Sequence, residues 1–442
     1  MNKYPLQISR IINGGFGLGQ FDDGRLVMVP HVLAGENVTI RIVAEKKSYL
    51  QGELLTIDRP SPHRVEPPCS YYEHCGGCDL QHGAYQEQLR IKRTILADLL
   101  ARQPNLSDQD LPAAIPPTVP SPRGTGYRQR IRLRIDKGQR LGFLQKRSHD
   151  LVVIDRCAIA TDELNTALQS LAPHPAARQL LGHSDEIELL YNPASSQVSA
   201  LFFLGRKPRA RDFTSAGQLV DDIAILERVF FIGAQTALTA AAPTGCDRLL
   251  TMDCDQPGNA HGRYTLQWEV GGFCQVNLGQ NHKLVATVCH YANPSSRETV
   301  LDLFCGAGNF SLPLAARALA LTGIEGQGSA IRSARANAAR ADCANTVFIQ
   351  QPVEQACREL VGQNQRYDCL VVDPPRQGIT GLAMALYRLC RHRLVYISCD
   401  PATLCRDLGD LTGCGFTISR IQPVDMFPQT HHIETVVLLE KH

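Results

Sequence analysis

The sequence has no long apolar run and no strong net charge, and these absences exclude several classes of protein. The first ten residues, MNKYPLQISR, contain no apolar segment of the kind that a signal peptide needs. No uncharged stretch approaches the ~20 apolar residues of a membrane-spanning helix. We therefore expect a soluble cytoplasmic protein without a membrane span. Because the net charge is only +2, partners must be inferred from local patches of charge.

Cysteine, by contrast, is abundant, with 16 among the 442 residues. Thiols stay reduced in a cytoplasm, so clustered cysteines there indicate metal binding or catalysis rather than disulfides. The chain is too long for one ordinary core, and two or three domains are expected. Changes of pattern along the chain divide it into residues 1–58, 59–266 and 267–442.

Residues 1–58 contain five short strand-like segments separated by turns. This pattern predicts a small OB-like barrel, a fold that commonly binds nucleic acid. Gly15, Gly17 and Gly19 form a G-x-G-x-G run, but no helical pattern follows it. The run therefore predicts a hairpin turn rather than a phosphate-binding loop.

Three cysteines lie close together in the segment CSYYEHCGGC, which runs from Cys69 through Cys75 to Cys78. The glycines let this loop wrap closely around a ligand. A site of this kind needs a fourth thiol, for which Cys157 is the plausible donor. Four thiolates suit zinc or an iron–sulfur cluster, and the three-plus-one spacing favours a 4Fe-4S cluster with a structural role. The alternative is three unrelated cysteines.

The middle of the chain carries one helical pattern and several strand patterns. An amphipathic helix is predicted over residues 84–104, and we expect it to pack on the C-terminal domain. The segments Glu186–Tyr191, Val198–Phe203 and Val229–Gly233 predict one mixed or antiparallel sheet. The central domain is therefore expected to be mixed α+β.

Four arginines recur at every second position: Arg128, Arg130, Arg132 and Arg134. Ile131 and Leu133 alternate with them, so a strand here would bury one face and present guanidinium groups on the other. Asp136 is the single acid in this part of the sequence, and like charges in a row repel. RNA is therefore favoured as a partner over an ordinary solvated strand face. A second basic group, Arg206–Arg211, extends the patch.

From about residue 267 strands and helices alternate, which predicts a doubly wound parallel α/β sheet. Its first strand leads into the glycine loop Cys305–Phe310, and its second strand ends at Glu325. Such a unit binds an adenosine-containing cofactor, because the glycines admit the ligand and the acid accepts from a ribose diol. S-adenosylmethionine (SAM) is favoured over NAD, because Ser311 replaces a third glycine and an Asp-Pro-Pro corner begins at Asp373.

The apolar run Leu394–Ile397 predicts a buried strand that stops at Ser398-Cys399-Asp400-Pro401. Residues 403–411 then have helical composition. Cys399 is thus expected at the carboxyl edge of the sheet, where ligands bind in α/β proteins. The alternative is a buried, inert cysteine.

Together these motifs resemble the uracil-5 RNA methyltransferases, and most of all the bacterial 23S rRNA enzymes with an N-terminal TRAM domain and a 4Fe-4S cluster. The resemblance covers nearly the whole chain. The matching segments are Cys69, Cys75, Cys78 and Cys157 for the cluster, Phe273–Asn277 for the F-x-Q-x-N motif, Leu301–Phe310 for the SAM loop, Asp373–Arg376, Ser398–Pro401 and His432–Glu434.

The resemblance implies that Cys399 is the nucleophile and Glu434 the base. It also implies the residues that line the SAM and uracil pocket: Gln275, Phe304, Asn309, Glu325 and Asp373. A thiolate adding at C6 of uracil would make C5 nucleophilic, so the site must favour the thiolate, and Arg376 is a candidate for that task. One departure is Pro352, where the family often has a polar contact to adenine; Gln351 or Glu354 is the substitute.

Three other functions remain open. A methyltransferase acting on an exocyclic amino group would use the Asp373 corner and need no cysteine nucleophile. An RNA-binding or assembly factor with an iron–sulfur cluster would bind RNA without turnover. The same C5 chemistry could act on the T-loop uridine of tRNA, although the TRAM-like barrel and cluster ligands favour 23S rRNA by resemblance. The sequence carries no oligomer signal, and a monomer is expected.

Overall fold

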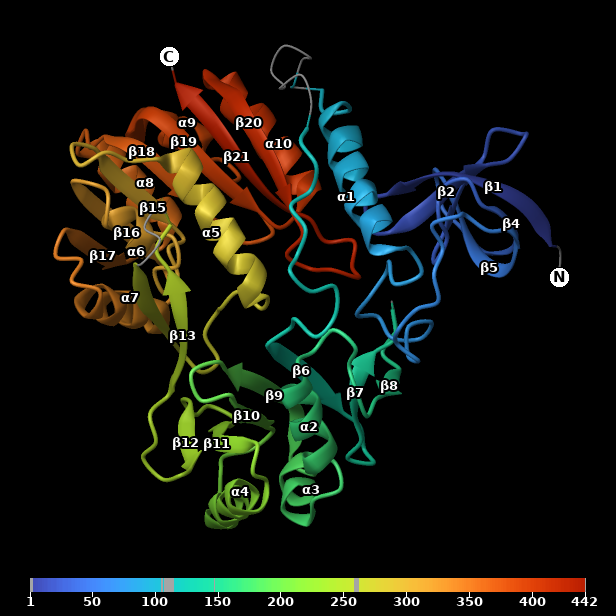
Figure 1. The fold of residues 1–442 in the computed structure, drawn as a ribbon, viewed down its shortest axis with the longest axis horizontal. Helices are drawn as coiled ribbons and strands as arrows, with labels where there is room; N and C mark the ends of the chain where they lie inside the picture. Colours follow the sequence, from blue (N-terminus) through green and yellow to red (C-terminus); the bar gives the residue numbers. More distant parts are fainter. Residues whose placement is uncertain (1–2, 105, 107–114, 147, 258–261, 442) are drawn as a thin grey trace.

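The computed structural model describes residues 3–104, 106, 115–146, 148–257 and 262–441. It contains a closed barrel, two seven-stranded sheets and a two-stranded sheet. Figure 1 shows the barrel at one end, the central sheet below and the C-terminal sheet above, with α1 (Tyr85–Leu100) between the barrel and the C-terminal sheet. Within these ranges no helix is long and apolar enough to cross a membrane.

The predicted barrel is confirmed, with strand order β1-β2-β3-β5-β4. Its strands are β1 (Tyr4–Ile12), β2 (Phe16–Gln20), β3 (Leu26–Val29), β4 (Asn37–Glu45) and β5 (Leu50–Arg59). The glycine run is a hairpin turn as expected, since Ile12 pairs with Phe16 across it. Gly14 and Gly15 there have φ values of +92° and +76°, which residues with a Cβ rarely adopt.

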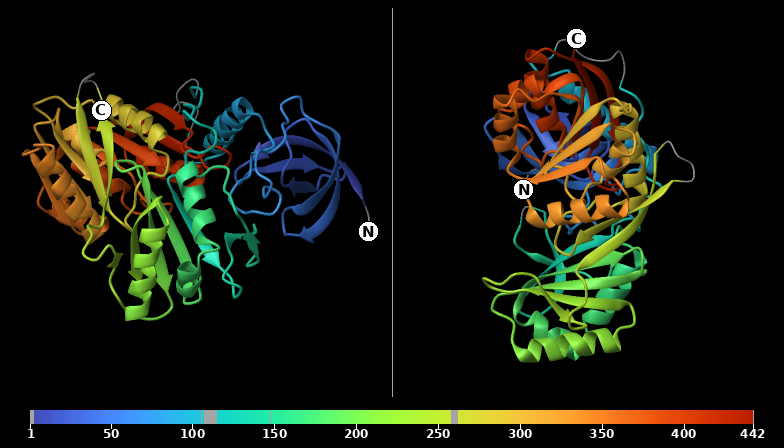
Figure 2. Two further views of the ribbon diagram at one scale, coloured as in Figure 1. Left: turned by 60° about the horizontal axis from the view of Figure 1, so that its bottom comes forward. Right: turned by 90° about the vertical axis from the view of Figure 1, so that its left-hand side faces the viewer.

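The predicted amphipathic helix is α1, which ends at Leu100. One side of the helix places Ile91 and Ile95 in the core of the barrel. The other side places Leu96 and Leu100 in the core of the C-terminal sheet. Because one helix contributes to both cores, it joins the barrel to the C-terminal region, and the left view of Figure 2 shows the helix between the two.

The predicted central sheet is mixed, in the order β12-β11-β10-β9-β6-β7-β8, with β10 and β11 parallel. Its elements are β6 (Arg130–Ile135), β7 (Leu141–Leu144), β8 (Leu151–Val153), α2 (Asp162–Leu171), α3 (Pro175–Leu181), β9 (Ser184–Asn192), β10 (Gln197–Leu204), α4 (Ala210–Asp222), β11 (Leu226–Ile232) and β12 (Thr239–Ala242). Apolar side chains of the three helices pack with those of the sheet in one core.

A separate hairpin follows, formed by β13 (Leu249–Asp255) and β14 (Arg263–Glu269). It lies outside the central sheet. Its buried side chains share a core with α7 (Gly328–Arg340) of the C-terminal region, because alternate residues of β13 and β14 are apolar. The hairpin therefore packs on the C-terminal region, although most of its residues precede residue 267.

The C-terminal sheet confirms the predicted doubly wound fold, in the order β17-β16-β15-β18-β19-β21-β20, except that β21 runs antiparallel to both of its neighbours in a sheet predicted to be parallel. Its elements are α5 (Leu278–Ala292), β15 (Thr299–Leu303), α6 (Ser311–Ala315), β16 (Ala320–Glu325), β17 (Thr346–Gln350), α8 (Val353–Gly362), β18 (Tyr367–Val372), α9 (Ala383–Leu389), β19 (Cys390–Ser398), α10 (Pro401–Gly413), β20 (Phe416–Val424) and β21 (Glu434–Lys441). From β15 the chain continues to β16 and β17 on one side, and then crosses to β18 on the other side of β15. The strand order therefore reverses between β15 and β18, and ligands bind at such switch points.

Candidate methyl-transfer site

A cavity of about 50 Å³ lies where β15 and β18 end, at the switch point of the sheet. Four of the residues predicted to bind SAM line it: Gln275, Phe304, Asn309 and Asp373. The fifth, Glu325, ends β16, where its carboxylate accepts a hydrogen bond of 2.8 Å from the backbone N–H of Gln327. The structure thus brings the glycine loop, the F-x-Q-x-N motif and the Asp-Pro-Pro corner to one place.

The glycine loop has an unusual backbone. Phe304 has a backbone φ of +61°, a value that residues other than glycine seldom adopt. Gly306 and Gly308 also have positive φ. Such strain concentrates at functional sites. Asn309 is held by two reciprocal hydrogen bonds with Asn281, of 2.9 and 3.0 Å. The positive φ values therefore set the shape of the loop, and the hydrogen bonds from Asn281 of α5 hold it in place.

The hairpin supplies three cavity residues that the sequence analysis missed: Met252, Leu266 and Trp268. Asn337 fixes the hairpin to the glycine loop, because its side chain bonds both the backbone of Gln267 and the carbonyl of Ala307. The alternation of apolar residues is a local signal for these two strands. Nothing in the local sequence indicates which other part of the protein the hairpin packs against.

Cys399 and Glu434 lie side by side at the carboxyl edge of the sheet. The last pair of the β19–β21 ladder joins Ser398 to Thr435, so Cys399 and Glu434 are the next two residues in that antiparallel register. The predicted strand-to-helix corner is confirmed: β19 ends at Ser398, and Asp400 caps α10 by accepting from the Thr403 N–H at 2.8 Å. The corner holds the thiol at the end of a rigid strand.

The side chains around Cys399 disfavour charge in the free protein. Burial raises the pKa of the Cys399 thiol to about 12, and the neighbouring Glu434 and Asp373 add to this, whereas Arg376 opposes it. Burial, and then Asp373, also raise the pKa of Glu434 well above its ordinary value. In the free protein burial, and to a smaller extent the two carboxyls, outweigh Arg376, so the thiolate expected in the reaction is not favoured before the substrate binds.

The pKa of Asp373 is raised in this setting. Burial raises its pKa to about 7, and the negative charge of Asp302 contributes. Asp302 is itself buried and accepts a hydrogen bond of 2.5 Å from Ser311, with its own pKa raised to about 7 by burial. The site thus holds acidic groups that can gain or lose protons near neutral pH.

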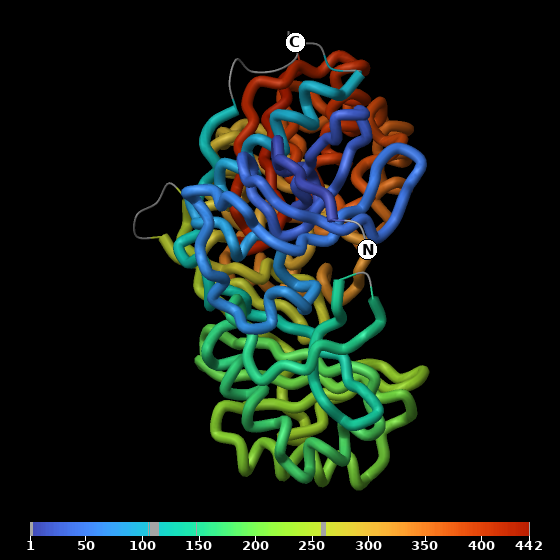
Figure 3. Tube along the Cα trace, turned by 90° about the vertical axis from the view of Figure 1, so that its right-hand side faces the viewer, coloured from blue at the N-terminus to red at the C-terminus, as the bar shows by residue number. Residues whose placement is uncertain are grey.

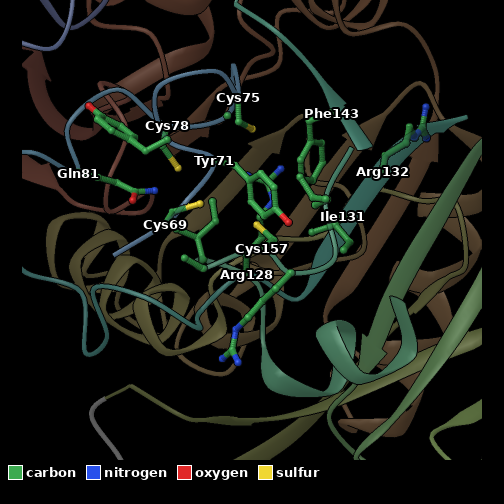
Figure 4. A pocket seen from close by; sticks show the side chains of 16 residues that line it. Cys69, Tyr71, Cys75, Cys78, Gln81, Arg128, Ile131, Arg132, Phe143 and Cys157 are labelled. Atoms are coloured by element: carbon green, nitrogen blue, oxygen red, sulfur yellow. The ribbon is translucent and has the colours of Figure 1, made fainter. Parts of the chain in front are cut away.

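The predicted ligand cysteines come together in a second place. Cys69, Cys75, Cys78 and Cys157 line one cavity of about 270 Å³, and Figure 4 shows their side chains around a common space. Asn165 fixes the Cys157 backbone by accepting from its N–H at 2.8 Å and donating to its carbonyl at 3.2 Å. Across the described ranges, no three His, Cys, Asp or Glu side chains form a ligand set for a single metal ion.

The arginine row is largely paired with acids. Arg130 lies 2.6 Å from Glu188, Arg134 lies 2.5 Å from Glu186, and Arg132 lies within 3.4 Å of both glutamates. Asp136 is the single acid near these arginines in the sequence, but β9 pairs with β6 and brings both glutamates alongside in the fold. The side chains of Arg132 and Arg134 remain about half exposed.

The arginine row leads toward the switch-point cavity. The Arg130 guanidinium donates to the carbonyl of Gly272 at 2.7 Å, just before the F-x-Q-x-N motif. The Gln129 N–H donates to the carbonyl of Val276 at 2.9 Å, within that motif. Arg128 lines the cysteine cavity. One strand thus connects the cysteine cavity, an exposed basic edge and the motif that lines the switch-point cavity.

Comparison with known proteins places this geometry in context. The family described as tRNA (Uracil-5-)-methyltransferase matches residues 259–442, and the TRAM domain matches residues 3–55. A Vibrio campbellii protein named 23S rRNA (uracil(1939)-C(5))-methyltransferase RlmD is 32% identical over 442 residues, covering 99% of this chain and 95% of its own. A Pseudomonas entomophila protein of the same name is 33% identical over 456 residues, covering 99% of this chain and 94% of its own.

Among solved structures, a Pyrococcus abyssi tRNA (uracil-54, C5)-methyltransferase in complex with S-adenosyl-L-homocysteine matches with a TM-score of 0.74. It is 24% identical and covers 98% of this chain and 99% of its own, so this match establishes the shared fold alone. The two bacterial relatives match at higher identity over nearly their whole lengths. With the motifs gathered at one sheet edge, these likenesses show that the chain belongs to the RNA uracil-C5 methyltransferase family.

Proposed function

We propose that this protein transfers a methyl group from SAM to C5 of a specific uridine in 23S rRNA. The observation that carries the proposal is the position of Cys399 and Glu434, which directly follow the last β19–β21 pair at the sheet edge that also carries the switch-point cavity. The 23S rRNA substrate is supported by the names of the bacterial relatives and by their coverage of the whole chain. The T-loop uridine of tRNA is the second candidate substrate.

In the proposed mechanism Cys399 attacks C6 of the uracil ring as a thiolate, and the ring electrons move onto the C4 oxygen. C5 thereby becomes nucleophilic. SAM, when bound, supplies the electrophilic methyl group. Glu434 then removes the C5 proton, the C5–C6 double bond re-forms, and the Cys399 thiolate leaves. Arg376 favours the thiolate or the developing oxyanion by its charge.

For SAM, we propose binding by Gln275, Phe304, Asn309 and Asp373, which share one cavity lining. Glu325 is proposed as the ribose acceptor, because it ends the strand next to the glycine loop. Gln351 is a reasonable substitute for the adenine contact that Pro352 cannot make, since its N–H donates to the carbonyl of Glu325 at 3.0 Å.

The proposal is tested by methyl transfer from labelled SAM to unmodified 23S rRNA and, separately, to unmodified tRNA, followed by nucleoside analysis. We expect label in 5-methyluridine from 23S rRNA alone. Label from tRNA alone would overturn the substrate. Label in an N-methylated base would overturn the C5 chemistry. RNA binding without any label would indicate an RNA-binding or assembly factor.

We also propose that Cys69, Cys75, Cys78 and Cys157 hold a 4Fe-4S cluster. The support is a shared cavity of about 270 Å³ lined by four thiols, which is a donor set suited to iron–sulfur chemistry. A cluster is larger than one ion and keeps its ligands farther apart, so this proposal agrees with the lack of a single-ion site among the described residues. The role proposed for the cluster is structural.

Protein purified without oxygen is therefore expected to contain iron and sulfide in near-equal amounts. Cys78→Ser is expected to lower both, because a hydroxyl is a poor ligand for iron. Cys254→Ser, which changes a buried cysteine of the β13–β14 hairpin, is the matched control and should leave the iron content unchanged. Stoichiometric zinc without iron in the unaltered protein would contradict the cluster.

For RNA, we propose that Arg128, Arg130, Arg132 and Arg134 guide the strand toward the switch-point cavity. Glu186 and Glu188 offset part of their charge, so the exposed Arg132 and Arg134 carry most of the proposed electrostatic attraction. Arg132 also lies over the ring of Phe203, with 4.5 Å between the guanidinium carbon and the ring centre. The target base must leave its stack to reach the half-buried Cys399 thiol.

Arg134→Ala is expected to weaken RNA binding a few-fold and to reduce the slope of log affinity against log salt by about 1. The reason is that each arginine near a phosphate releases bound counterions. Arg391→Ala is the control. Arg391 is similarly exposed and paired with Asp368, but it lies near the amino end of β19, whereas Cys399 follows the carboxyl end of that strand. If the slope of log affinity against log salt were equal for the two variants, the proposed role of the arginine row in RNA binding would be contradicted.

The proposed division of labour is a nucleic-acid-binding barrel over residues 1–58, a cluster- and RNA-binding region over 59–266 and a catalytic domain over 267–442. The tube view in Figure 3 shows the barrel and the central region as separate bodies against the C-terminal sheet. We propose a monomer acting in the cytoplasm, since Cys399 and Glu434 come from one chain.

A further inference from the structure

The segment between β20 and β21, residues 425–433, runs directly into Glu434. Four distant parts of the chain hold it. From the central region, the Tyr127 hydroxyl donates to the carbonyl of Pro428 at 2.9 Å, and from the F-x-Q-x-N motif Asn277 donates to the carbonyl of Met426 at 3.1 Å. The other two parts are α1 and the loop that carries the cysteines.

Helix α1 holds one side of the segment through buried polar groups. Lys92 forms a fully buried ion pair with Asp425 at 2.5 Å and donates to the carbonyl of Phe427 at 2.9 Å. Gln88 and Gln429 exchange two hydrogen bonds of 2.9 Å, one from each residue. Gln429 has a φ of +70°, so these contacts keep its backbone in a conformation that it seldom adopts.

The cysteine loop holds the other side through Asp79, the residue directly after Cys78. The Asp79 carboxylate lies 2.6 Å from Nδ1 of His431 and also pairs with Lys146. The N–H groups of Asp79 and Leu80 both donate to the carbonyl of Gln429 at 3.0 Å. The Asp79 side chain is only 6% exposed, so little water competes for these contacts.

The barrel closes over this pair. A Cβ added to Gly15 would lie 2.9 Å from the Cβ of Asp79 and 3.3 Å from that of His431, so the barrel turn approaches both side chains closely. The Lys146 ammonium lies 4.8 Å from the ring centre of Phe16. The Asp79–His431 pair is therefore enclosed where the barrel, the cysteine loop and the segment before Glu434 meet.

We propose that Asp79 is a positioning residue, which fixes His431 and thereby the backbone that presents Glu434 to the substrate base. This inference rests on the proposed role of Glu434. Two residues separate His431 from Glu434, so a shift of His431 is transmitted to the carboxylate over a short distance. Because Asp79 follows Cys78, the shape of the cysteine loop is coupled to the step in which the C5 proton is removed.

The test is Asp79→Asn, which preserves shape and removes the charge. We expect kcat to fall about tenfold or more, because small displacements of a catalytic group are costly. The KM for SAM should not change. Since only proton removal is slowed, denaturing gels should show more protein covalently linked to RNA during turnover than in the unaltered protein.

Two further measurements separate positioning from misfolding. Iron and sulfide contents of Asp79→Asn should equal those of the unaltered protein, and hydrogen exchange of residues 425–433 should be faster. His431→Asn, which lies outside the cysteine loop, should show the same adduct accumulation, and the double variant should be no worse than either single one. Asp368→Asn, a buried aspartate at the amino end of β18, is the matched control with unchanged turnover.

Normal turnover, adduct level and exchange in both Asp79→Asn and His431→Asn would overturn the inference, as would lowered kcat without added adduct. These results differ from failure of the proposed function, in which the unaltered protein itself methylates no RNA. In that case the hydrogen-exchange comparison still decides whether Asp79 holds the segment: unchanged exchange would overturn the inference, and faster exchange would support it.

Discussion

Replacing Cys399 by alanine is expected to abolish methylation of uracil, with a loss in rate on the order of 10⁴-fold or more. Without the thiolate, C5 has no route to nucleophilic character, so the remaining site binds substrates that cannot react. SAM binding should persist, because Cys399 is not among the residues that line the switch-point cavity, where we propose that SAM binds. The measurement is single-turnover transfer of labelled methyl groups, with SAM affinity determined in parallel.

The matched control is Cys405→Ala. Cys405 lies on α10, one turn beyond the same corner, and is 4% exposed, so its loss creates a small cavity without touching the reacting groups. Full activity in Cys399→Ala would exclude the thiolate mechanism and favour methyl transfer to an exocyclic amino group.

The protonation state of Cys399 sets the expected pH dependence. Burial and the nearby carboxyls raise the pKa of the thiol to about 12, so the free thiol is protonated at neutral pH. The thiolate fraction then grows with pH, and single-turnover methylation is expected to rise between pH 7 and pH 9, by up to about tenfold per unit. A flat profile over this range would show that thiolate formation does not limit the reaction.

Replacing Glu434 by glutamine is expected to lower turnover by about 10²–10⁴-fold, the usual contribution of a general base. Addition of Cys399 and methylation of C5 can still occur, but the C5 proton has no acceptor. Covalent protein–RNA adduct should therefore accumulate, visible as a slower band on denaturing gels.

The double variant Cys399→Ala, Glu434→Gln is the control and should form no adduct. Glu434 is 3% exposed, and replacement by glutamine keeps the size of the side chain while removing the carboxyl that could accept the proton. A Glu434→Gln protein with normal turnover and no adduct would assign proton removal to another group, of which Asp373 is the nearest titrating candidate.

Local patterns in the sequence predicted most of the fold. Turn glycines marked the barrel, and the apolar run before Ser398 marked the strand that carries Cys399 to the sheet edge. The glycine loop and the Asp373 corner were also recognisable, because each is a short segment whose shape depends on its own residues. These features lie where local sequence and final structure agree.

Features made by distant residues could not be predicted. Arg130 meets Glu188, 58 positions away, only because β6 and β9 pair in one register. Trp268 reaches the switch-point cavity because the hairpin packs on α7, which no local signal specifies. The Asp79–His431 contact spans 352 positions, and it depends on how three parts of the chain meet.

The measurement that tests the account most directly is mass spectrometry of the adduct formed by Glu434→Gln with unmodified 23S rRNA and SAM, after digestion with trypsin and nuclease. The account predicts that the peptide spanning 394–406 carries one 5-methyluridine nucleotide, and that fragmentation places it on Cys399 rather than Cys405. An adduct on another residue, an adduct with unmethylated uridine, or no adduct from a protein that still binds RNA and SAM would contradict it.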